Sequence, residues 1–346
     1  MNDDEHPSRA PRKRPATIVD VAEAAGVAIG TVSRHLNGLP IRYTNRQSIE
    51  RAIAQLGYRR NSAAVAMKTD TTHVVGFLVP SLGEFHAHML EHISREIRQT
   101  GRAVLTYCHD TEHDAMQAGL DFFASQRVDA LVVNGDESMA TILRQMTEAG
   151  TPLILYDNDI LGLPAHRVFS DNRNVSFRLV SHLMDLGHER IAIIHGNLAD
   201  SSARERLAGF EQALQARGHE PDPALVVDGQ WRSAHGYDAM RRLMSLSNRP
   251  TAVFGASYTM TFGALSFARE SGIKIPDDIS VVSFDDVPAF RLFDPAITTV
   301  AQPIAKIAQT ISRIINRHMS APALDDFSHN VIECEILLRA STRRHG

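Results

Sequence analysis

Residues 18–38, IVDVAEAAGVAIGTVSRHLNG, decide the fold of the N-terminal part of this 346-residue chain. Two short apolar runs flank Gly26, and a glycine at this point suits a tight turn between two short helices. The apolar spacing predicts the first helix over about 18–25 and the second over about 29–36.

The caps of these helices can also be predicted from the sequence. Thr17 and Asp20 have the spacing of a capping box at the start of the first helix. Thr44 and Gln47 have the same spacing and are expected to open a third helix, which Gly57 ends. Three short helices with a tight turn between the first two form a helix-turn-helix. The residues expected to face its core are Val21, Ala22, Ala25, Val32, Leu36, Ile49, Ala52, Ile53 and Leu56.

Charge is distributed unevenly along the chain. The whole sequence has a formal net charge of −4, yet residues 9–61 contain ten Lys and Arg against three acidic residues. A basic module on an acidic body indicates that a polyanion binds the module alone. A solubilising basic tail would explain residues 9–14 but not the remaining basic residues.

The outer face of the second predicted helix is polar and free to enter a DNA major groove. Arg34 can bind a guanine edge and Ile29 can contact a thymine methyl group, whereas small polar side chains suit phosphate oxygens. A small helical bundle with a solvated polar face is the alternative. The residues predicted to contact DNA in this part are Thr17, Ile29, Gly30, Thr31, Ser33, Arg34 and Asn37.

From residue 73 onward, apolar runs of strand type alternate with amphipathic segments of helical length. This alternation predicts parallel sheets covered on both faces, and about eight such units favour two doubly wound lobes. A ligand crevice is expected at the carboxyl ends of the strands. The predicted strands lie within 73–80, 103–108, 128–135, 151–157, 190–196, 224–229, 251–257 and 279–286.

The crevice can be given a chemistry from residue types alone. Asp285 and Asp286 end a predicted strand, and an ionised carboxylate accepts hydrogen bonds from neighbouring hydroxyls. Arg206 offers a rigid fork of donors, and we expect it to pair with Asp285 when the site is empty. Trp231, the only tryptophan, offers a flat apolar face for a sugar.

The chain resembles the lactose-repressor (LacI/GalR) family of bacterial transcription regulators. The phrases that carry the likeness are TIVDVAEAAGVAIGTVSRHLNG (17–38), LGHERIAIIHG (186–196) and IPDDISVVSFDD (275–286). The resemblance implies an all-α helix-turn-helix head, joined by a hinge helix to an α/β two-lobed effector domain like a periplasmic binding protein. The implied parts are a basic tail (1–15), a DNA-binding domain (16–60), a hinge (61–72) and an effector and dimerisation domain (73–340; lobe 1 about 73–169 plus 304–330, lobe 2 about 170–300 plus 331–340).

In the family, the hinge segment orders on operator DNA and inserts an apolar side chain into the minor groove. By this likeness Met67 is the wedge, and Asn61 and Ala64 contact DNA beside it. Without the resemblance, the segment is a plain linker.

The resemblance also implies effector contacts at Asp157, Arg206, Trp231 and Asp285, together with Asn134. For Asp157, capping a strand end is the alternative role. This chain has Ser257-Tyr258 where the family usually has Asn-Asp, so the class of effector stays open. The family's aromatic position at the lip of the pocket falls on Phe85 or His86.

The remaining sequence patterns argue against an enzyme, a secreted protein and a membrane protein. HMLEH (88–92) matches a zinc-protease pattern, but in a chain with 17 histidines a chance match is easy. HDTEHD (109–114) is expected to cap and solvate a loop. No nucleotide-binding or nucleophile-elbow motif occurs, so neither an enzyme nor a cofactor is predicted. Two cysteines, no secretory signal and no membrane-length apolar run predict a cytoplasmic protein.

The sequence therefore predicts a DNA-binding transcriptional regulator, a repressor that acts as a homodimer under the control of a small sugar-like effector. The absence of leucine heptads at the C-terminus favours a dimer. A co-repressed regulator with a nucleoside or purine-like effector, and a ligand-binding module that does not bind DNA, are the alternatives.

Overall fold

The computed structural model describes residues 14–60, 71–110, 112–320 and 327–346. The chain divides into two compact units, Met1–Thr72 and His73–Gly346. We call the first the head and the second the effector unit, and each is described by itself.

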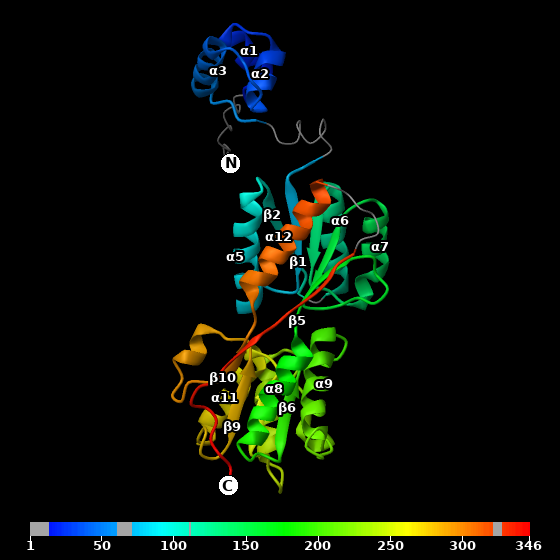
Figure 1. Cartoon of the computed structure of the whole chain (residues 1–346), viewed down its shortest axis with the longest axis vertical. Coiled ribbons are helices and arrows are strands. Elements are labelled where there is room, and N and C mark those ends of the chain that lie inside the picture. Colours follow the sequence, from blue (N-terminus) through cyan, green and yellow to red (C-terminus); the bar gives the residue numbers. More distant parts are fainter. Residues whose placement is uncertain (1–13, 61–70, 111, 321–326) are drawn as a thin grey trace, which may run out of the picture. The chain divides into compact units, whose positions relative to one another are not determined.

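The head contains the three predicted helices, α1 (Ile18–Ala25), α2 (Ile29–Leu36) and α3 (Tyr43–Leu56) (Figure 1). Gly26 ends α1 with a φ of 65°, a conformation that a residue without Cβ adopts at no steric cost. The Thr17–Asp20 capping box is present, with the Asp20 amide donating to Thr17 Oγ1 at 3.3 Å. The buried core of the head is small and consists of Val21, Ala22, Val32, Ile49 and Ala52.

Two details of α3 differ from the sequence-based prediction. The helix is capped by Arg42 without a side-chain hydrogen bond, so Thr44 lies inside the first turn and is not the cap. Ile41, before the helix, packs against the core of the head. Leu56, which was expected to face the core, is 38% exposed.

The first lobe of the effector unit is built on a parallel sheet with the strand order β11-β5-β4-β3-β1-β2. Its central strands β1, β3 and β4 are buried on both faces, so they form continuous apolar runs. They are β1 (Val74–Val79), β2 (Ala103–Cys108), β3 (Ala130–Val133), β4 (Leu153–Tyr156), β5 (His166–Ser170) and β11 (His329–Ile332).

The second lobe has a sheet of the same design, with the order β12-β10-β9-β8-β6-β7. All of its neighbouring strands are parallel except β10 and β12, which are antiparallel. The strands are β6 (Ile191–His195), β7 (Val226–Asp228), β8 (Ala252–Gly255), β9 (Ser280–Phe284), β10 (Thr298–Ala301) and β12 (Glu335–Leu337).

Helices cover both faces of each sheet, as the alternation of strands and helices predicts. In the first lobe, α5 (Glu84–Gln99) and α12 (Ile304–Ser320) pack on one face, and α6 (His113–Gln126) and α7 (Ala140–Glu148) pack on the other. In the second lobe, α8 (Asn172–Asp185) contacts α9 (Ser201–Gln215), and α10 (Ser233–Met244) contacts α11 (Tyr258–Glu270). Short 3-10 turns lie at Glu137–Met139, Pro223–Leu225 and Pro288–Arg291.

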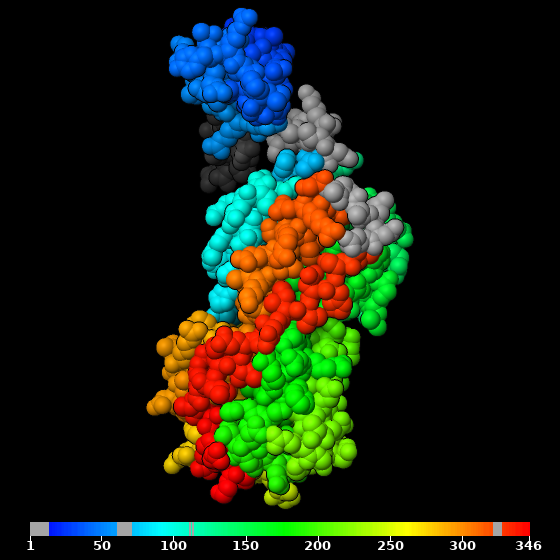
Figure 2. Space-filling view, in the orientation of Figure 1, coloured from blue at the N-terminus to red at the C-terminus, as the bar shows by residue number. Residues whose placement is uncertain are grey.

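The chain passes between the lobes three times, after β5, after β10 and after β11. The C-terminal segment, drawn in red, runs over one face of the effector unit from the first lobe to the second (Figure 2). The sequence-based strand assignment omits β5, β10, β11 and β12, which are three to five residues long and contain polar residues. Their polar residues interrupt the apolar run that reveals the other strands.

Candidate functional site

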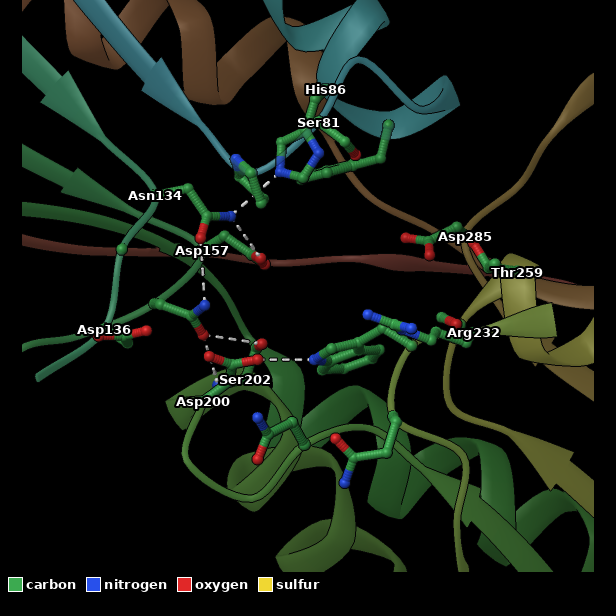
Figure 3. A pocket seen from close by; sticks show the side chains of 18 of the residues that line it. Ser81, His86, Asn134, Asp136, Asp157, Asp200, Ser202, Arg232, Thr259 and Asp285 are labelled. Atoms are coloured by element: carbon green, nitrogen blue, oxygen red, sulfur yellow. Dashed lines mark hydrogen bonds between the residues drawn. The ribbon is translucent and has the colours of Figure 1, made fainter. Parts of the chain in front are cut away.

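A cavity of about 530 Å³ lies between the two lobes and is lined by residues of both (Figure 3). It opens at the carboxyl ends of the parallel strands, where a crevice was expected. All nine residues predicted to contact an effector line it, namely Phe85, His86, Asn134, Asp157, Arg206, Trp231, Ser257, Tyr258 and Asp285.

The ends of strands supply most of these side chains, because Asn134 follows β3, Asp157 follows β4 and Asp285 follows β9. Asp157, Trp231 and Asp285 adopt positive φ angles of 63°, 58° and 71°. L-residues rarely adopt this region, and such local strain gathers at binding sites. Asp110 and Gln230, which also line the cavity, adopt positive φ angles of 47° and 48°.

A chain of hydrogen bonds crosses the first lobe's wall of the cavity. The Asn134 side-chain amide donates to Asp157 Oδ2 at 3.1 Å and lies 3.1 Å from His86 Nε2. Burial lowers the pKa of His86 to about 4, so the imidazole is neutral at pH 7 and accepts this bond. Asn158 donates to Asn134 Oδ1, and its own oxygen accepts from the Ser202 amide and hydroxyl of the second lobe.

Arg206 is 3% exposed and lies between the lobes. Its guanidinium donates to Asn172 Oδ1 at 2.9 Å and to the Ala256 carbonyl at 2.7 Å, and it lies 3.6 Å from the centroid of the Phe284 ring. The same group lies 5.5 Å from the centroid of the Trp231 ring. One face of the indole is therefore next to a cation.

The expected pairing of Arg206 with Asp285 is wrong. Arg206 Nη2 lies 3.8 Å from Asp157 Oδ1, and Asp285 Oδ1 instead accepts a hydrogen bond of 2.7 Å from Gln302. Arg206 is turned toward Asp157 because its other nitrogens bind Asn172 and the end of β8.

The position of Asp286 also differs from the prediction that both Asp285 and Asp286 face the crevice. Its carboxylate is held by Arg291 at 2.7 Å and Arg339 at 2.6 Å, and it does not line the main cavity. Side chains of consecutive residues at a strand end point in opposite directions, so only Asp285 of the two faces the effector cavity.

Ser257 and Tyr258, the pair that departs from the family pattern, have structural partners. Ser257 caps α11, with its hydroxyl oxygen accepting from the Met260 amide. The Tyr258 hydroxyl accepts a hydrogen bond of 2.9 Å from the Glu84 amide at the start of α5. Tyr258 thus links the second lobe to the first at the edge of the cavity.

The sequence analysis missed several residues that line the cavity. His109 was assigned to a solvated loop, but it is 2% exposed and faces the cavity with Asp110. His109 and Asp136 directly follow predicted strands, a signal that could have found them. Asn197 and Gln230 carry the same signal, because they directly follow the predicted strands 190–196 and 224–229. Asp200 and Gln302 carry no comparable signal, because they lie in loops that tertiary packing brings to the cavity.

Residues of the zinc-protease pattern (88–92) have structural roles. Glu91 pairs with Arg95 on the surface of α5 at 2.7 Å, and Met89 of the same helix is buried in the core. In the ranges that the structure covers, no group of three or more His, Cys, Asp or Glu side chains is placed to hold a metal ion.

Four of the predicted DNA-contacting residues are exposed on the head, namely Ile29, Gly30, Arg34 and Asn37. Ile29 is 48% exposed, and Arg34 is exposed with one nitrogen 3.2 Å from the Pro40 carbonyl. Asn37 accepts a hydrogen bond from Arg60, and Thr17 is occupied by the capping box. Gly30 is exposed and Thr31 and Ser33 are half-buried, whereas Asn61, Ala64 and Met67 lie outside the residues that the structure describes.

A helix-turn-helix head followed by two α/β lobes around a polar cavity defines the class of ligand-responsive transcriptional regulators. Comparison with known proteins agrees: residues 17–61 match the family of bacterial regulatory proteins of the lacI type, and residues 180–342 match the periplasmic binding protein-like domain. The chain belongs to the LacI family of bacterial transcriptional regulators.

Relatives with established names are similar over nearly the whole chain. The transcriptional repressor PurR of Haemophilus influenzae is 28% identical, covering 95% of this chain and 99% of the relative. The repressor CytR of Escherichia coli K12 is 29% identical, covering 95% and 96%. Among solved structures, a lac repressor dimer bound to operator and the anti-inducer ONPF has a TM-score of 0.85 at 26% identity, covering 95% of this chain and 100% of that one.

A complex of the regulator CelR with cellobiose is also similar, with a TM-score of 0.72 at 28% identity and coverage of 95% and 100%. No helix in the described part of the chain is long and apolar enough to cross a membrane.

Proposed function

We propose that this protein is a cytoplasmic repressor that binds operator DNA as a homodimer. Its affinity for the operator falls or rises when a small hydroxyl-bearing effector binds in the cavity. It is a binding protein and not an enzyme. The effector acts by linkage, because it changes operator affinity only as far as it prefers one arrangement of the lobes.

The convergence of the nine predicted effector residues on one cavity supports this proposal most strongly. They come from separate segments between Phe85 and Asp285, and they combine carboxylates, an amide, a guanidinium and aromatic rings. Such a set suits a polyol, whose hydroxyls donate to carboxylates while its C–H face packs on an aromatic ring.

On the DNA side, Arg34 reads a guanine in the major groove, and the neighbouring polar residues of α2 bind phosphates. Met67 is the proposed minor-groove wedge beside Asn61 and Ala64. The relatives named as repressors and the operator-bound lac repressor support this role.

The test uses the full-length protein in two steps. Its affinity for random duplex DNA is measured against salt concentration, and a steep fall is expected because binding releases counterions. An operator is then selected from a random library, and its affinity is measured with and without compounds that raise the melting temperature of the protein. A flat salt response, or no compound that changes operator affinity, would contradict the proposal.

A purine-like or nucleoside effector is the second candidate. The aromatic side chains Phe85, Tyr258 and Trp231 line the cavity and could stack on a base. Including nucleosides and purine bases beside sugars in the thermal screen decides between the two, since a stabilising base without a stabilising sugar would favour the second.

A further inference from the structure

Acidic residues dominate the charge of the effector cavity. Five aspartates line it, Asp110, Asp136, Asp157, Asp200 and Asp285, against the two arginines Arg206 and Arg232. The two histidines of the lining add no positive charge at pH 7, because burial lowers the pKa of both His86 and His109. The wall of the cavity therefore has an excess of negative charge, which disfavours an anionic ligand.

Two of these carboxylates face the cavity from different lobes. Asp157 ends β4 in the first lobe, and Asp200 is the residue before α9 in the second (Figure 3). Burial raises the pKa of Asp157 to about 6, Arg206 opposes this shift, and the charges of Asp285 and Asp200 add to it. Burial also raises the pKa of Asp200, with a further contribution from Asp136. The two lobes thus present like charges to each other across the cavity.

The protein supplies only part of the compensation that these charges need. Arg206 lies 3.8 Å from Asp157, which is longer than a hydrogen bond, and two of its nitrogens are committed to Asn172 and Ala256. Asp200 accepts a hydrogen bond of 2.6 Å from Trp231, a neutral donor, and forms no ion pair with any residue in the described ranges.

A second observation independently indicates a missing donor. Asp157 Oδ1 is buried and accepts no hydrogen bond in the described structure, whereas its Oδ2 accepts from Asn134. A buried polar atom without a partner is rare in a folded protein and costs free energy until a ligand satisfies it. Asp157 lines the cavity, so a ligand can supply that donor.

The nitrogen donors of Asn134, Asn158 and Trp231 on this part of the wall all bind protein groups. Asn134 donates to Asp157, Asn158 donates to Asn134, and the indole of Trp231 donates to Asp200. What this part of the wall still offers a ligand is therefore mainly carboxylate oxygen, which accepts hydrogen bonds and attracts positive charge.

We infer that the effector carries a protonated amine, which lies between Asp157 and Asp200 and binds both carboxylates. This inference rests on the proposed function, because it takes the cavity to be the effector site. An ammonium group donates three hydrogen bonds, satisfies Asp157 Oδ1 and replaces repulsion between the lobes by attraction of both to one cation. The same charges disfavour phosphorylated or carboxylated compounds.

The first test compares three acyclic polyols of the same length that differ in charge: glucamine, sorbitol and gluconate. Binding to the full-length protein is measured at pH 7.5 by calorimetry. We expect glucamine to bind at least about tenfold more tightly than sorbitol, and gluconate to bind most weakly. Equal or tighter binding of sorbitol or gluconate, or no binding of glucamine at millimolar concentration, would overturn the inference.

Two variants locate the effect. Asp200→Asn removes the charge but keeps an oxygen that accepts from Trp231, so it should abolish the preference for glucamine over sorbitol. Asp238→Asn makes the same change of net charge on the exposed side of α10, outside the cavity lining, and should keep the preference. Loss of the preference in both variants would show that only the overall charge matters and would reject the site.

A measurement without any ligand completes the test. Asp200→Asn should raise the melting temperature of the empty protein, because it relieves repulsion of Asp157, and a lowered melting temperature would contradict the inference.

Calorimetry and melting measurements involve no DNA, so they test the ligand class separately from the regulatory function. If the amine preference fails while a neutral compound still changes operator affinity, the ligand class is wrong and the regulatory function stands.

Discussion

The head and the effector unit build their binding surfaces in opposite ways. In the head, Ile29 is 48% exposed and Arg34 is exposed, and the buried core consists of other residues. In the effector unit, Arg206 is 3% exposed and Asp285 is 8% exposed, and both hydrogen-bond to other parts of the protein.

This difference has a consequence for every substitution. On the head, an exposed side chain that is predicted to contact DNA can be changed with little effect on folding, because few native contacts are lost. A side chain in the cavity is part of the packed interior, so its removal affects both binding and stability. The following predictions test this contrast, beginning with the largest effect.

Arg206→Ala should lower the free energy of unfolding of the effector unit by about 3 to 5 kcal/mol, because it leaves buried partners without their donor and removes the cation beside Asp157. Denaturant unfolding of the full-length protein measures the loss. Arg34→Ala is the matched control in the head and should change stability by less than about 0.5 kcal/mol. A similar loss of unfolding free energy in both variants would contradict the difference between the cavity and the head.

His86 should make the effector unit less stable in acid. Its folded pKa is about 4 against an ordinary value of 6.5, so the unfolded chain binds the proton more readily. Stability conferred by the neutral imidazole is complete above pH 6.5 and falls as pH is lowered toward 4, by on the order of 3 kcal/mol. His86→Gln should flatten this fall in denaturant titrations over that range, and an unchanged slope would reject the buried neutral state.

Asp157 should act in the opposite direction. Its folded pKa is about 6 against an ordinary 3.8, so the folded protein binds the proton more readily between these values. Stability contributed by the protonated carboxyl is present below about pH 4 and is lost as pH rises to 6, by on the order of 2 to 3 kcal/mol. Relative to the parent, Asp157→Asn should therefore become progressively more stable over that interval, as thermal melts at several pH values will show.

Arg34→Ala should relax operator specificity, costing about 1 to 3 kcal/mol at one base pair. The measurement compares operators changed at single positions with random DNA. Arg51→Ala, which alters an exposed arginine on α3, should weaken all sequences alike. Equal loss of specific and random binding in Arg34→Ala would show that Arg34 binds phosphate and does not read a base.

Thr17→Ala should have the smallest effect and should be confined to the head. It removes the capping box of α1 and should cost about 1 kcal/mol of head stability, while Thr17→Ser should retain most of it. Hydrogen exchange of the α1 amides reports the change locally. Faster exchange in the effector unit as well would show that the two units do not unfold separately.

How much of the structure the sequence predicts also differs between the head and the effector unit. The bounds of α1 and α2 and the Thr17 cap were predicted correctly, because helix periodicity and capping depend on residues three or four positions apart. The class of fold and the strands β1 to β4 and β6 to β9 were also predictable from continuous apolar runs. The cap of α3 was predicted wrongly, because the helix begins at Tyr43 after Arg42 and Thr44 lies within its first turn.

Within the cavity, the sequence identified the residue types at strand ends but not their partners. The resemblance to the family implied that Asp157, Arg206 and Asp285 contact one effector, and the carboxyl ends of the parallel strands indicated where the crevice lies. Only the tertiary structure decided that Arg206 turns to Asp157, that Gln302 binds Asp285 and that Asp200 joins the site. Local patterns fix what a residue can do, whereas the partner of a buried charge depends on packing between segments that lie far apart in the sequence.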